Sequence, residues 1–481
     1  MSNPLATRQF DARDQYRFAE LSGDRNPIHL DAVEARRSFL GVPIVHGVHC
    51  VLWALESYLL RLSEEGAARP LRLTHLNFKL PNPVRLQRQI TASLIKETEG
   101  QAWSARLRLQ DGQQTVADIL LEGEVAGEPG AAELSALSET PVAPQIHAMD
   151  DIDGLAGSVA LAGDAAAFRQ AFPQTCAILG VAPVARLTGL SRLVGLECPG
   201  RYSLLFAADM IFLPGPDTGA LEYAVHHAER KLSRVQIALS GAACRGKITA
   251  FLRPAPVAQP ALAAIAGRID KTAMADRKAL IVGGSRGLGE AAAKILAASG
   301  SDMAITYFHG AEDAARVRDE INAWGGRCRA IRLDVASPDN LAGGLDGWPP
   351  DQLYYFATPA IFGPRVGAFD RARLDEFLSC YVSGFDKVYR ALRPLVRGGL
   401  DIFYPSSVAV EVADRETVEY AAAKLAGESL CRETARQDEN VNILVKRLAR
   451  INTDQTASLR HFEAEDAVTV MTEIVREMTV G

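Results

Sequence analysis

The chain has 481 residues, too many for one hydrophobic core, and the usual domain size suggests about three domains. Its composition, 48% hydrophobic and 23% charged with a formal net charge of -6, gives no electrostatic reason to bind nucleic acid or an anionic membrane. Seven scattered cysteines without a Cys-x-x-Cys pair argue against a disulfide framework or a metal site, and a polar start without any 18-residue apolar run predicts a cytoplasmic protein.

The first part of the chain predicts one long helix followed by strands. A helical start at residues 11–21 and a turn lead to an apolar helix at about 48–61. Segments with two-residue hydrophobic alternation follow at 71–78, 89–96, 102–109 and 115–124. A central helix followed by an antiparallel run of strands is the hotdog arrangement.

The second part repeats this order. An apolar helix is predicted at 184–196, and strands follow at 202–213, 220–228, 235–239 and 247–252. Runs rich in Gly, Ala, Pro and Ser at about 126–145 and 254–261 predict linkers. We therefore expect an α+β tandem hotdog, with units at 1–127 and 146–253.

The third part, residues 276–481, alternates short apolar strands with helices. The predicted strands are 279–282, 302–306, 329–333, 352–357, 401–404 and 442–446. This βαβ alternation predicts an α/β Rossmann-type, doubly wound parallel sheet.

Two polar residues stand five positions apart in the stretch FAELSGDRNPIHLD, namely Asp24 and His29. A reaction that removes a weakly acidic proton and a hydroxyl group requires a base for the proton and an acid for the departing hydroxyl group. A carboxylate and an imidazole on either side of an Asn-Pro turn can converge on one substrate. Alternatively, the stretch is only a turn and His29 a structural hydrogen-bonding group.

The segment GVPIVHG, 12 residues after His29, favours the catalytic interpretation. Together the two stretches resemble the MaoC-like (R)-specific enoyl-thioester hydratases over most of residues 10–125. The resemblance implies that Asp24 and His29 are the catalytic pair and that Gly47 opens the central helix. A backbone N–H at that helix N-terminus can stabilise charge on the thioester oxygen. We assign His46 and His49 to packing or to the rim of the site.

The second hotdog has no comparable pair. His226 and His227 are adjacent in a predicted strand, so their side chains should point to opposite faces and at most one could reach a site. We expect this half to be a structural partner that contributes part of the wall of the acyl tunnel.

A glycine-rich turn joins the first strand of the third unit to a helix in ALIVGGSRGLGEAAAKILAASG. In this βα context the helix N-terminus receives a pyrophosphate. With LDV at 333–335, SSV at 406–408 and YAAAK at 420–424, the segment resembles the short-chain dehydrogenase/reductase family over about 200 residues. The resemblance implies catalysis by Ser407, Tyr420 and Lys424. The implied cofactor-binding residues are Gly283, Ser285, Arg286, Gly287, Leu288, Gly289, Asp334 and Val335, together with Tyr420 and Lys424.

The chemistry explains these residue types. Ketone reduction needs a proton donor, and the ammonium group of Lys424, one helical turn after Tyr420, can lower the pKa of the phenol. The second strand ends without the Asp or Glu that an NAD site usually has, and Arg286 could pair with a 2′-phosphate. NADPH is therefore expected rather than NADH.

Several positions depart from the family pattern. Tyr355 to Thr358 replace the usual Asn-Asn-Ala-Gly turn, Tyr381 stands where a relay asparagine is common, and Lys446 and Arg447 replace a Pro-Gly pair. Lys446, Arg447 and Arg450 could contact the phosphate of a thioester carrier or form a solvated basic edge.

These features predict a bifunctional enzyme that reduces a 3-oxoacyl thioester and dehydrates the (3R)-hydroxyacyl product in fatty-acid or polyketide-like synthesis. The reverse, oxidative pair and a hydratase with a non-catalytic nucleotide-binding domain stay open as alternatives. The expected partner is an acyl-CoA or acyl carrier protein thioester, and we expect a homo-oligomer, such as a dimer.

Overall fold

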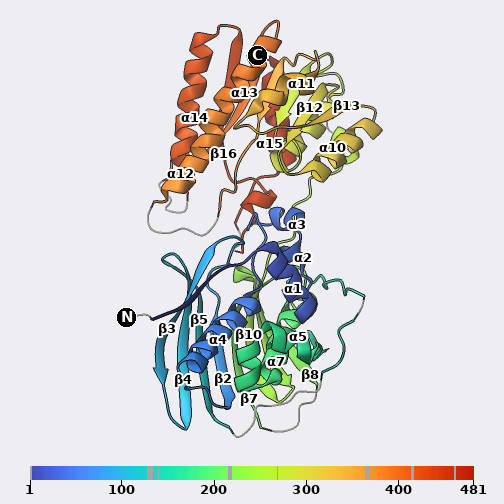
Figure 1. Cartoon of the computed structure of the whole chain (residues 1–481). Coiled ribbons are helices and arrows are strands. Elements are labelled where there is room, and N and C mark those ends of the chain that lie inside the picture. Colours follow the sequence, from blue (N-terminus) through green and yellow to red (C-terminus); the bar gives the residue numbers. More distant parts are fainter. Residues whose placement is uncertain are drawn as a thin grey trace. The chain divides into compact units, whose positions relative to one another are not determined.

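A computed structural model describes residues 3–126, 134–138, 140–214, 219–267, 269–362, 369–412, 417–459 and 462–480. The chain divides into two compact units (Figure 1). Unit 1 contains residues 1–255 with 458–461, and unit 2 contains residues 256–457 with 462–481.

Unit 1 is built on one ten-stranded sheet with the order β1-β3-β4-β5-β2-β7-β10-β9-β8-β6. The strands are β1 (Asn3–Gln9), β2 (Leu71–Lys79), β3 (Gln89–Thr98), β4 (Ala102–Asp111), β5 (Gln114–Val125), β6 (Ala156–Ala160), β7 (Ser203–Phe212), β8 (Ala220–Glu229), β9 (Arg234–Gly241) and β10 (Cys244–Leu252). All of the pairings are antiparallel.

The sheet consists of two halves with the same strand order. Read outward from the central β2–β7 pair, one half runs β2-β5-β4-β3-β1 and the other runs β7-β10-β9-β8-β6. Each strand of the first half therefore has a counterpart in the second. The predicted linker at 126–145 connects the halves, and part of it (127–133 and 139) lies outside the described residues.

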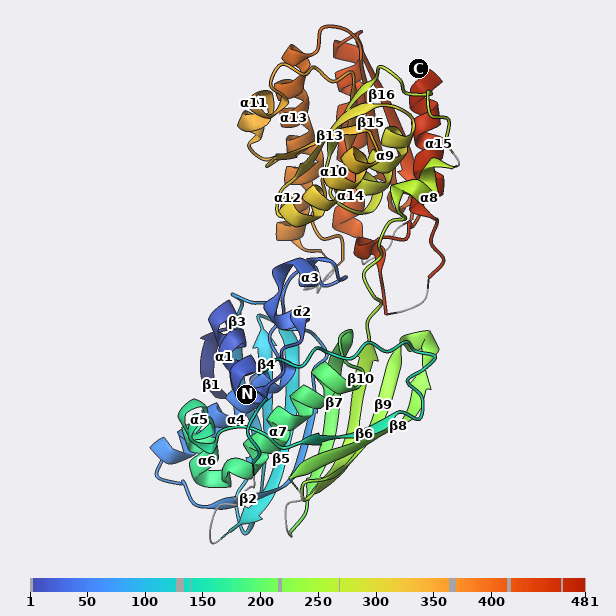
Figure 2. The same ribbon diagram turned by 90° about the vertical axis from the view of Figure 1, so that its right-hand side faces the viewer.

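Each half places one long helix on the same face of the sheet (Figure 2). These helices are α4 (Gly47–Glu64) and α7 (Val181–Arg192), and α7 continues as a π-helical turn at Leu193–Glu197. The smaller helices of unit 1 are α1 (Ala12–Ser22), α2 (Pro27–Leu30), α3 (Ala32–Arg36), α5 (Ala165–Ala171) and α6 (Pro173–Leu179). Buried aliphatic and aromatic side chains from both halves form a single core between helices and sheet.

Unit 2 is a six-stranded parallel sheet with the order β13-β12-β11-β14-β15-β16, as the predicted βαβ alternation requires. Its strands are β11 (Lys278–Val282), β12 (Asp302–Tyr307), β13 (Arg327–Arg332), β14 (Gln352–Tyr355), β15 (Leu400–Ser407) and β16 (Val441–Leu448). The helices are α8 (Leu262–Ala266), α9 (Gly287–Ala298), α10 (Ala311–Ala323), α11 (Leu341–Leu345), α12 (Arg371–Leu378), α13 (Phe385–Leu392), α14 (Val418–Gln437) and α15 (Ala467–Val480). A π-helical segment at Ser379–Gly384 joins α12 to α13.

The second predicted linker, 254–261, is held by specific contacts within unit 2. The Asp454 carboxylate accepts a hydrogen bond from the Val257 N–H (2.6 Å), and the buried Lys294 ammonium donates to the Pro260 carbonyl (2.9 Å). Lys294 also pairs with Glu290 and Glu320, and Glu320 accepts from the Leu262 N–H. The segment is thus partly fixed rather than a free tether.

Two details of unit 1 differ from the sequence-based expectation. Strands β1 and β6, at the two ends of the sheet, were not predicted, because edge strands bury little and show weak alternation: β6 has one buried residue. His226 and His227 are both exposed, because a β-bulge between Val225 and His227 breaks the alternation of side chains. In the described part of the chain no helix combines the length and hydropathy needed to cross a membrane.

Candidate active sites

The Asp24 and His29 side chains meet at the start of helix α4. Asp24 lies in the turn after α1, where its Oδ1 accepts a hydrogen bond from the Asn26 N–H (3.2 Å). His29 belongs to the short helix α2, which Asn26 caps. An Asp24 carboxylate oxygen and ring nitrogens of His29 and His46 all lie within 4.8 Å of one another. The structure therefore brings the predicted pair together.

Burial gives the two groups unusual protonation behaviour. The pKa of the Asp24 carboxyl is raised because the side chain is 2% exposed, although His29 and Ser191 act in the opposite direction. Burial also lowers the pKa of His29 to about 3, so the imidazole is neutral near pH 7. Its Nδ1 faces the Ile44 carbonyl (2.9 Å) and must carry the proton, which leaves Nε2 as a free base.

His46 supports this pair rather than extending it. Its ring stacks on that of His29 with centroids 3.8 Å apart. Its Nδ1 lies 2.9 Å from Gln15 Oε1, and its Nε2 lies 3.1 Å from the Asp24 carbonyl oxygen. Because both ring nitrogens of His46 already lie against oxygen atoms, the Asp24–His29–His46 group fits acid–base chemistry better than metal ligation.

Gly47 is the first residue of α4, where a backbone N–H has no acceptor within the helix. A Cβ atom at this position would lie 2.4 Å from Leu80 Cδ1, so a larger residue would require the Leu80 side chain to move. Leu205 of the second half lies 3.9 Å from the same point. The Gly47 N–H at the helix N-terminus is thus surrounded by residues from both halves.

The second half also holds the catalytic turn. Ser191 of α7 donates a hydrogen bond to Asp24 Oδ2 (2.7 Å), and a Cβ atom on Gly195 would lie only 2.2 Å from Asp24 Oδ1. The Asn26 amide donates to the carbonyls of Gly195, Gly200 and Arg201 at 2.8 to 3.2 Å. The second half therefore forms part of this site.

Sequence reasoning did not find Ser191 and Gly195. Their effect depends on contacts between residues about 170 positions apart, which no local pattern shows. The one available signal was Gly195 within an otherwise apolar helical run, since an internal glycine is unfavourable unless packing requires it.

In unit 2 the glycine-rich turn has the geometry of a phosphate-binding turn. Gly283 and Gly287 have positive φ values (82° and 58°), and Gly287 is the first residue of α9. A Cβ atom on Gly289 would lie 2.2 Å from the Gly283 carbonyl oxygen, so the glycine allows α9 to pack against the turn. Ser285 belongs to the same turn, and Leu288 is the second residue of α9. These residues fit a dinucleotide, as predicted.

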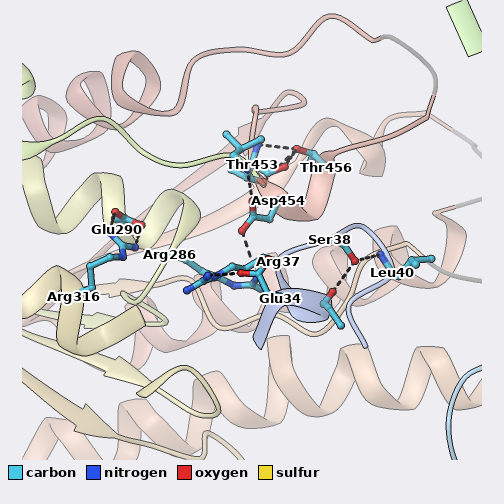
Figure 3. A network of polar contacts seen from close by, with 12 residues as sticks. Glu34, Arg37, Ser38, Leu40, Arg286, Glu290, Arg316, Thr453, Asp454 and Thr456 are labelled. Carbon is cyan, nitrogen blue, oxygen red and sulfur yellow. Dashed lines mark hydrogen bonds and ion pairs between the residues drawn. The ribbon is translucent and has the colours of Figure 1, made fainter. Parts of the chain in front are cut away.

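Arg286 is the N-cap residue of α9, and its guanidinium lies 3.5 Å from the Asp454 carboxylate (Figure 3). Asp454 belongs to a turn that Thr453 and Thr456 cap reciprocally, and Thr453 packs near Gly287. Asp334 and Val335 follow strand β13, and the Asp334 carboxylate accepts from the Ala336 N–H (2.9 Å). The arginine is thus oriented beside the glycine turn.

Ser407 and Tyr420 lie together at the carboxyl end of β15, where Ser407 is the last residue of the strand. The Ser407 hydroxyl forms a hydrogen bond with Tyr420, which lowers the pKa of the phenol, but burial has the larger effect and raises it to about 12. Lys424 is 6% exposed, and its ammonium donates to the Pro405 carbonyl at 2.7 Å. Burial lowers the pKa of Lys424 to about 7. The structure therefore places all three predicted residues in one site.

The basic residues at the end of β16 and just after it are largely paired within the chain. Lys446 pairs with Glu477, and Arg447 pairs with Glu411 and Glu428. The Arg450 guanidinium lies over the rings of Phe362 and Phe462. Because of these contacts, the three basic residues are less available to bind the phosphate of a thioester carrier than the sequence predicted.

Two family models match the chain. Residues 3–115 match the model described as MaoC like domain, and residues 277–465 match the model described as short chain dehydrogenase. Together these matches cover both candidate sites.

Several curated proteins are similar to part of the chain. A 3-oxoacyl-[acyl-carrier-protein] reductase of Synechocystis sp. is 39% identical over 15% of this chain and 28% of its own length. The "Probable tetrahydroxynaphthalene reductase" of Zymoseptoria tritici is 35% identical over 26% and 45%, respectively. A 3-oxoacyl-[acyl-carrier-protein] reductase of Aggregatibacter actinomycetemcomitans is 27% identical over 36% and 76%. The chain thus spans less than half the length of the first two relatives.

Proposed function

Because this chain joins a MaoC-like domain to a short-chain dehydrogenase domain, we propose that it is a bifunctional enzyme of 3-oxygenated acyl thioesters. One domain reduces the 3-oxo group with NADPH, and the other removes water from the (3R)-hydroxyacyl product to give the trans-2-enoyl thioester. The observation that carries the proposal is that one chain holds a converging Asp24–His29 pair and a clustered Ser407, Tyr420 and Lys424.

In the dehydration step His29 Nε2 removes the proton from C2 of the substrate. The bond between C3 and oxygen breaks, and the protonated Asp24 carboxyl gives its proton to the hydroxyl group, which leaves as water. The raised pKa of Asp24 favours its role as a proton donor, and the lowered pKa of His29 leaves a neutral imidazole that can act as a base. The Gly47 N–H stabilises the charge that develops on the thioester oxygen.

In the reduction step Tyr420 donates a proton to the ketone oxygen, and Ser407 orients that oxygen. When bound, NADPH supplies the hydride that adds to C3. The amides of the glycine turn and the N-terminus of α9 would hold the pyrophosphate, Arg286 the 2′-phosphate, and Asp334 with Val335 the adenine. The absence of Asp and Glu at the end of β12, Thr306-Tyr307-Phe308-His309, supports NADPH over NADH.

We propose further that unit 1 is a tandem hotdog, with halves at 1–127 and 146–253 and the Rossmann domain at 276–481. The repeated strand order supports this division. The reductase product is the substrate of the dehydratase, so one chain carries two consecutive steps. The thioester carrier is coenzyme A or an acyl carrier protein, and the enzyme acts as a cytoplasmic homo-oligomer.

One observation favours a second candidate, a hydratase whose Rossmann domain only binds nucleotide. Lys424 donates a hydrogen bond to the Pro405 carbonyl and is enclosed by tyrosine rings, so its ammonium group is held by contacts within the protein. The reverse, oxidative pair uses the same residues and is distinguished only by the direction of turnover.

The two candidates separate in one absorbance experiment. Purified protein is mixed with NADPH and a short 3-oxoacyl thioester, and the reduced-nicotinamide and enoyl-thioester bands are followed separately. The proposal expects NADPH loss together with enoyl growth, and a Tyr420→Phe variant should lose the first while still dehydrating a supplied (3R)-hydroxyacyl thioester. Enoyl formation from the 3-hydroxy compound without cofactor turnover would select the second candidate.

A further inference from the structure

Three tyrosine rings surround the ammonium group of Lys424. Its Nζ lies 3.9 Å from the ring centroid of Tyr381, 5.2 Å from that of Tyr404 and 5.7 Å from that of Tyr420. The hydrogen bond to the Pro405 carbonyl is a fourth contact. Carboxylates are absent from this set of contacts as far as the described residues go, so the charge is held mainly by ring faces and one carbonyl.

The π-helical segment Ser379–Gly384 places Tyr381 in this enclosure. A π-helix leaves some carbonyls without their usual partners, and here two tyrosine hydroxyls from the sheet satisfy them. Tyr355 donates to the Cys380 carbonyl (2.7 Å) and Tyr404 donates to the Tyr381 carbonyl (3.0 Å). Tyr381 in turn shares a hydrogen bond of 2.5 Å with Thr358 through its own hydroxyl group.

Glycines make room for this arrangement. A Cβ atom on Gly427, one turn after Lys424 in α14, would lie 2.0 Å from the Tyr404 hydroxyl oxygen. A Cβ atom on Gly384 would lie 3.0 Å from the Tyr355 hydroxyl oxygen. The tyrosines that depart from the family pattern are therefore parts of one consistent packing arrangement, not isolated replacements.

An ammonium group in such a dry site needs compensation for the water it has lost. A ring face within about 6 Å of the cation provides such compensation, and the effect is larger when the cation is desolvated. The other titratable groups that influence Lys424 are Cys380 of the π-helical segment and Cys431 of α14. Both thiols have raised pKa values and remain neutral near pH 7, so they cannot replace the rings.

We propose that Tyr381 is a positioning residue of the reductase, whose ring face keeps the Lys424 ammonium group charged and fixed behind Tyr420. This inference rests on the proposed function for its catalytic meaning. The ring, not the hydroxyl group, performs this role, which distinguishes it from a hydrogen-bonding residue.

The charge of Lys424 can be measured directly in the full chain labelled with ¹³Cε-lysine. The resonance that disappears in Lys424→Arg is followed by NMR as the pH is raised. Compared with the wild type, Tyr381→Phe should leave the titration midpoint unchanged, whereas Tyr381→Leu and Tyr381→Met should lower it by about one pH unit. Tyr389→Leu, on α13 with its hydroxyl group on Asp438, is the control for loss of another tyrosine and should leave the midpoint unchanged.

A midpoint in folded Tyr381→Leu or Tyr381→Met that equals or exceeds the wild-type value would overturn the inference, as would a Phe variant that behaves like Leu. Reductase kinetics give the second readout. Phe should keep kcat within about twofold, and Leu should lower kcat about tenfold at pH 8 and move the alkaline limb of the pH profile downward by the same unit. Absence of NADPH turnover in the wild type would refute the proposed reductase, while the NMR midpoints would still decide the role of Tyr381.

Discussion

The two halves of unit 1 contain nearly the same tetrapeptide at related places, with opposite outcomes. Leu-Ser-Gly-Asp ends at Asp24, and Leu-Ala-Gly-Asp ends at Asp164. Both carboxylates accept a hydrogen bond from the backbone N–H two residues later. Asp24, however, is buried beside His29, whereas Asp164 is exposed and only caps helix α5. Five residues after each aspartate stand His29 in one half and an exposed Arg169 in the other.

The two halves therefore share an architecture, but the pair of polar residues Asp24 and His29 has no counterpart at Asp164 and Arg169. In the proposed mechanism the first half supplies the acid and the base, and the second half supplies Ser191 and the space at Gly195 that hold Asp24. The pair of halves is therefore complementary rather than redundant. Three substitutions test this division of labour, and a fourth tests the stability of unit 1.

The largest effect is expected for Asp24→Asn. The amide cannot donate a carboxylic proton to the departing hydroxyl group, so hydration and dehydration rates should fall by about 10²- to 10⁴-fold. Enoyl-thioester absorbance measures both directions. The matched change Asp164→Asn should leave the rate within about twofold, and an equal loss in both variants would mean that the halves do not differ in function.

Gly195→Ala should have the next largest effect. The added methyl group would meet the Asp24 carboxylate at 2.2 Å and displace it, and displacement by about 1 Å can cost about 10²-fold in rate. Gly189→Ala, in α7, is the control, because its methyl group meets only leucine side chains, at 3.1 Å or more. Undiminished dehydratase activity in folded Gly195→Ala would show that the second half does not shape the site.

Ser191→Ala removes one hydrogen bond to a carboxylate and should lower the dehydratase rate about tenfold. Since that bond lowers the pKa of Asp24, its loss should move the Asp24 limb of the pH–rate profile to higher pH. Ser57→Ala, whose buried hydroxyl bonds only within helix α4, should leave the profile in place. If this limb of the profile stays in place in Ser191→Ala, Ser191 does not influence the ionisation of Asp24.

The smallest effect concerns stability. His49 is buried between aromatic rings, its Nδ1 has no hydrogen-bond partner in the described structure, and burial lowers its pKa to about 3. The unfolded chain, with a histidine pKa near 6.5, therefore binds more protons between pH 6.5 and 3, so unit 1 loses stability as the pH falls through this range.

The His49→Phe variant has no group at this position that can take up a proton. Between pH 7 and pH 5 the free energy of unfolding of the variant should therefore fall by about 2 kcal/mol less than that of the wild type. Urea unfolding at the two pH values measures the difference. His227→Phe, an exposed control, should not change the pH dependence. An unaltered pH dependence in His49→Phe would show that His49 is protonated in the folded state.

The sequence predicted the elements whose pattern is local. The central helix α4, the strands β2 to β5 and the βαβ order of unit 2 follow from hydrophobic periodicity, and the Asp24–His29 and Tyr420–Lys424 pairs follow from spacing within one turn or helix. What it missed depends on distant contacts. Ser191 acts only after α7 reaches the first half, the bulge at His226 depends on its pairing with β9, and Tyr381 acquires a role only when Tyr404 and Lys424 pack around it.

The β2–β7 pairing at the centre of the sheet has a consequence for synthesis on the ribosome. The edge of β2 stays unpaired until β7, which ends at Phe212, has been made, 133 residues after Lys79. At about 5 to 20 residues per second this delay is on the order of ten seconds, during which an exposed strand edge invites pairing with other chains. His75 and Lys79 place polar groups along that edge, and His75 later lies between Glu122 and Asp209 across the completed pair. The nascent chain thus carries its own protection against aggregation at the position where the two halves will join.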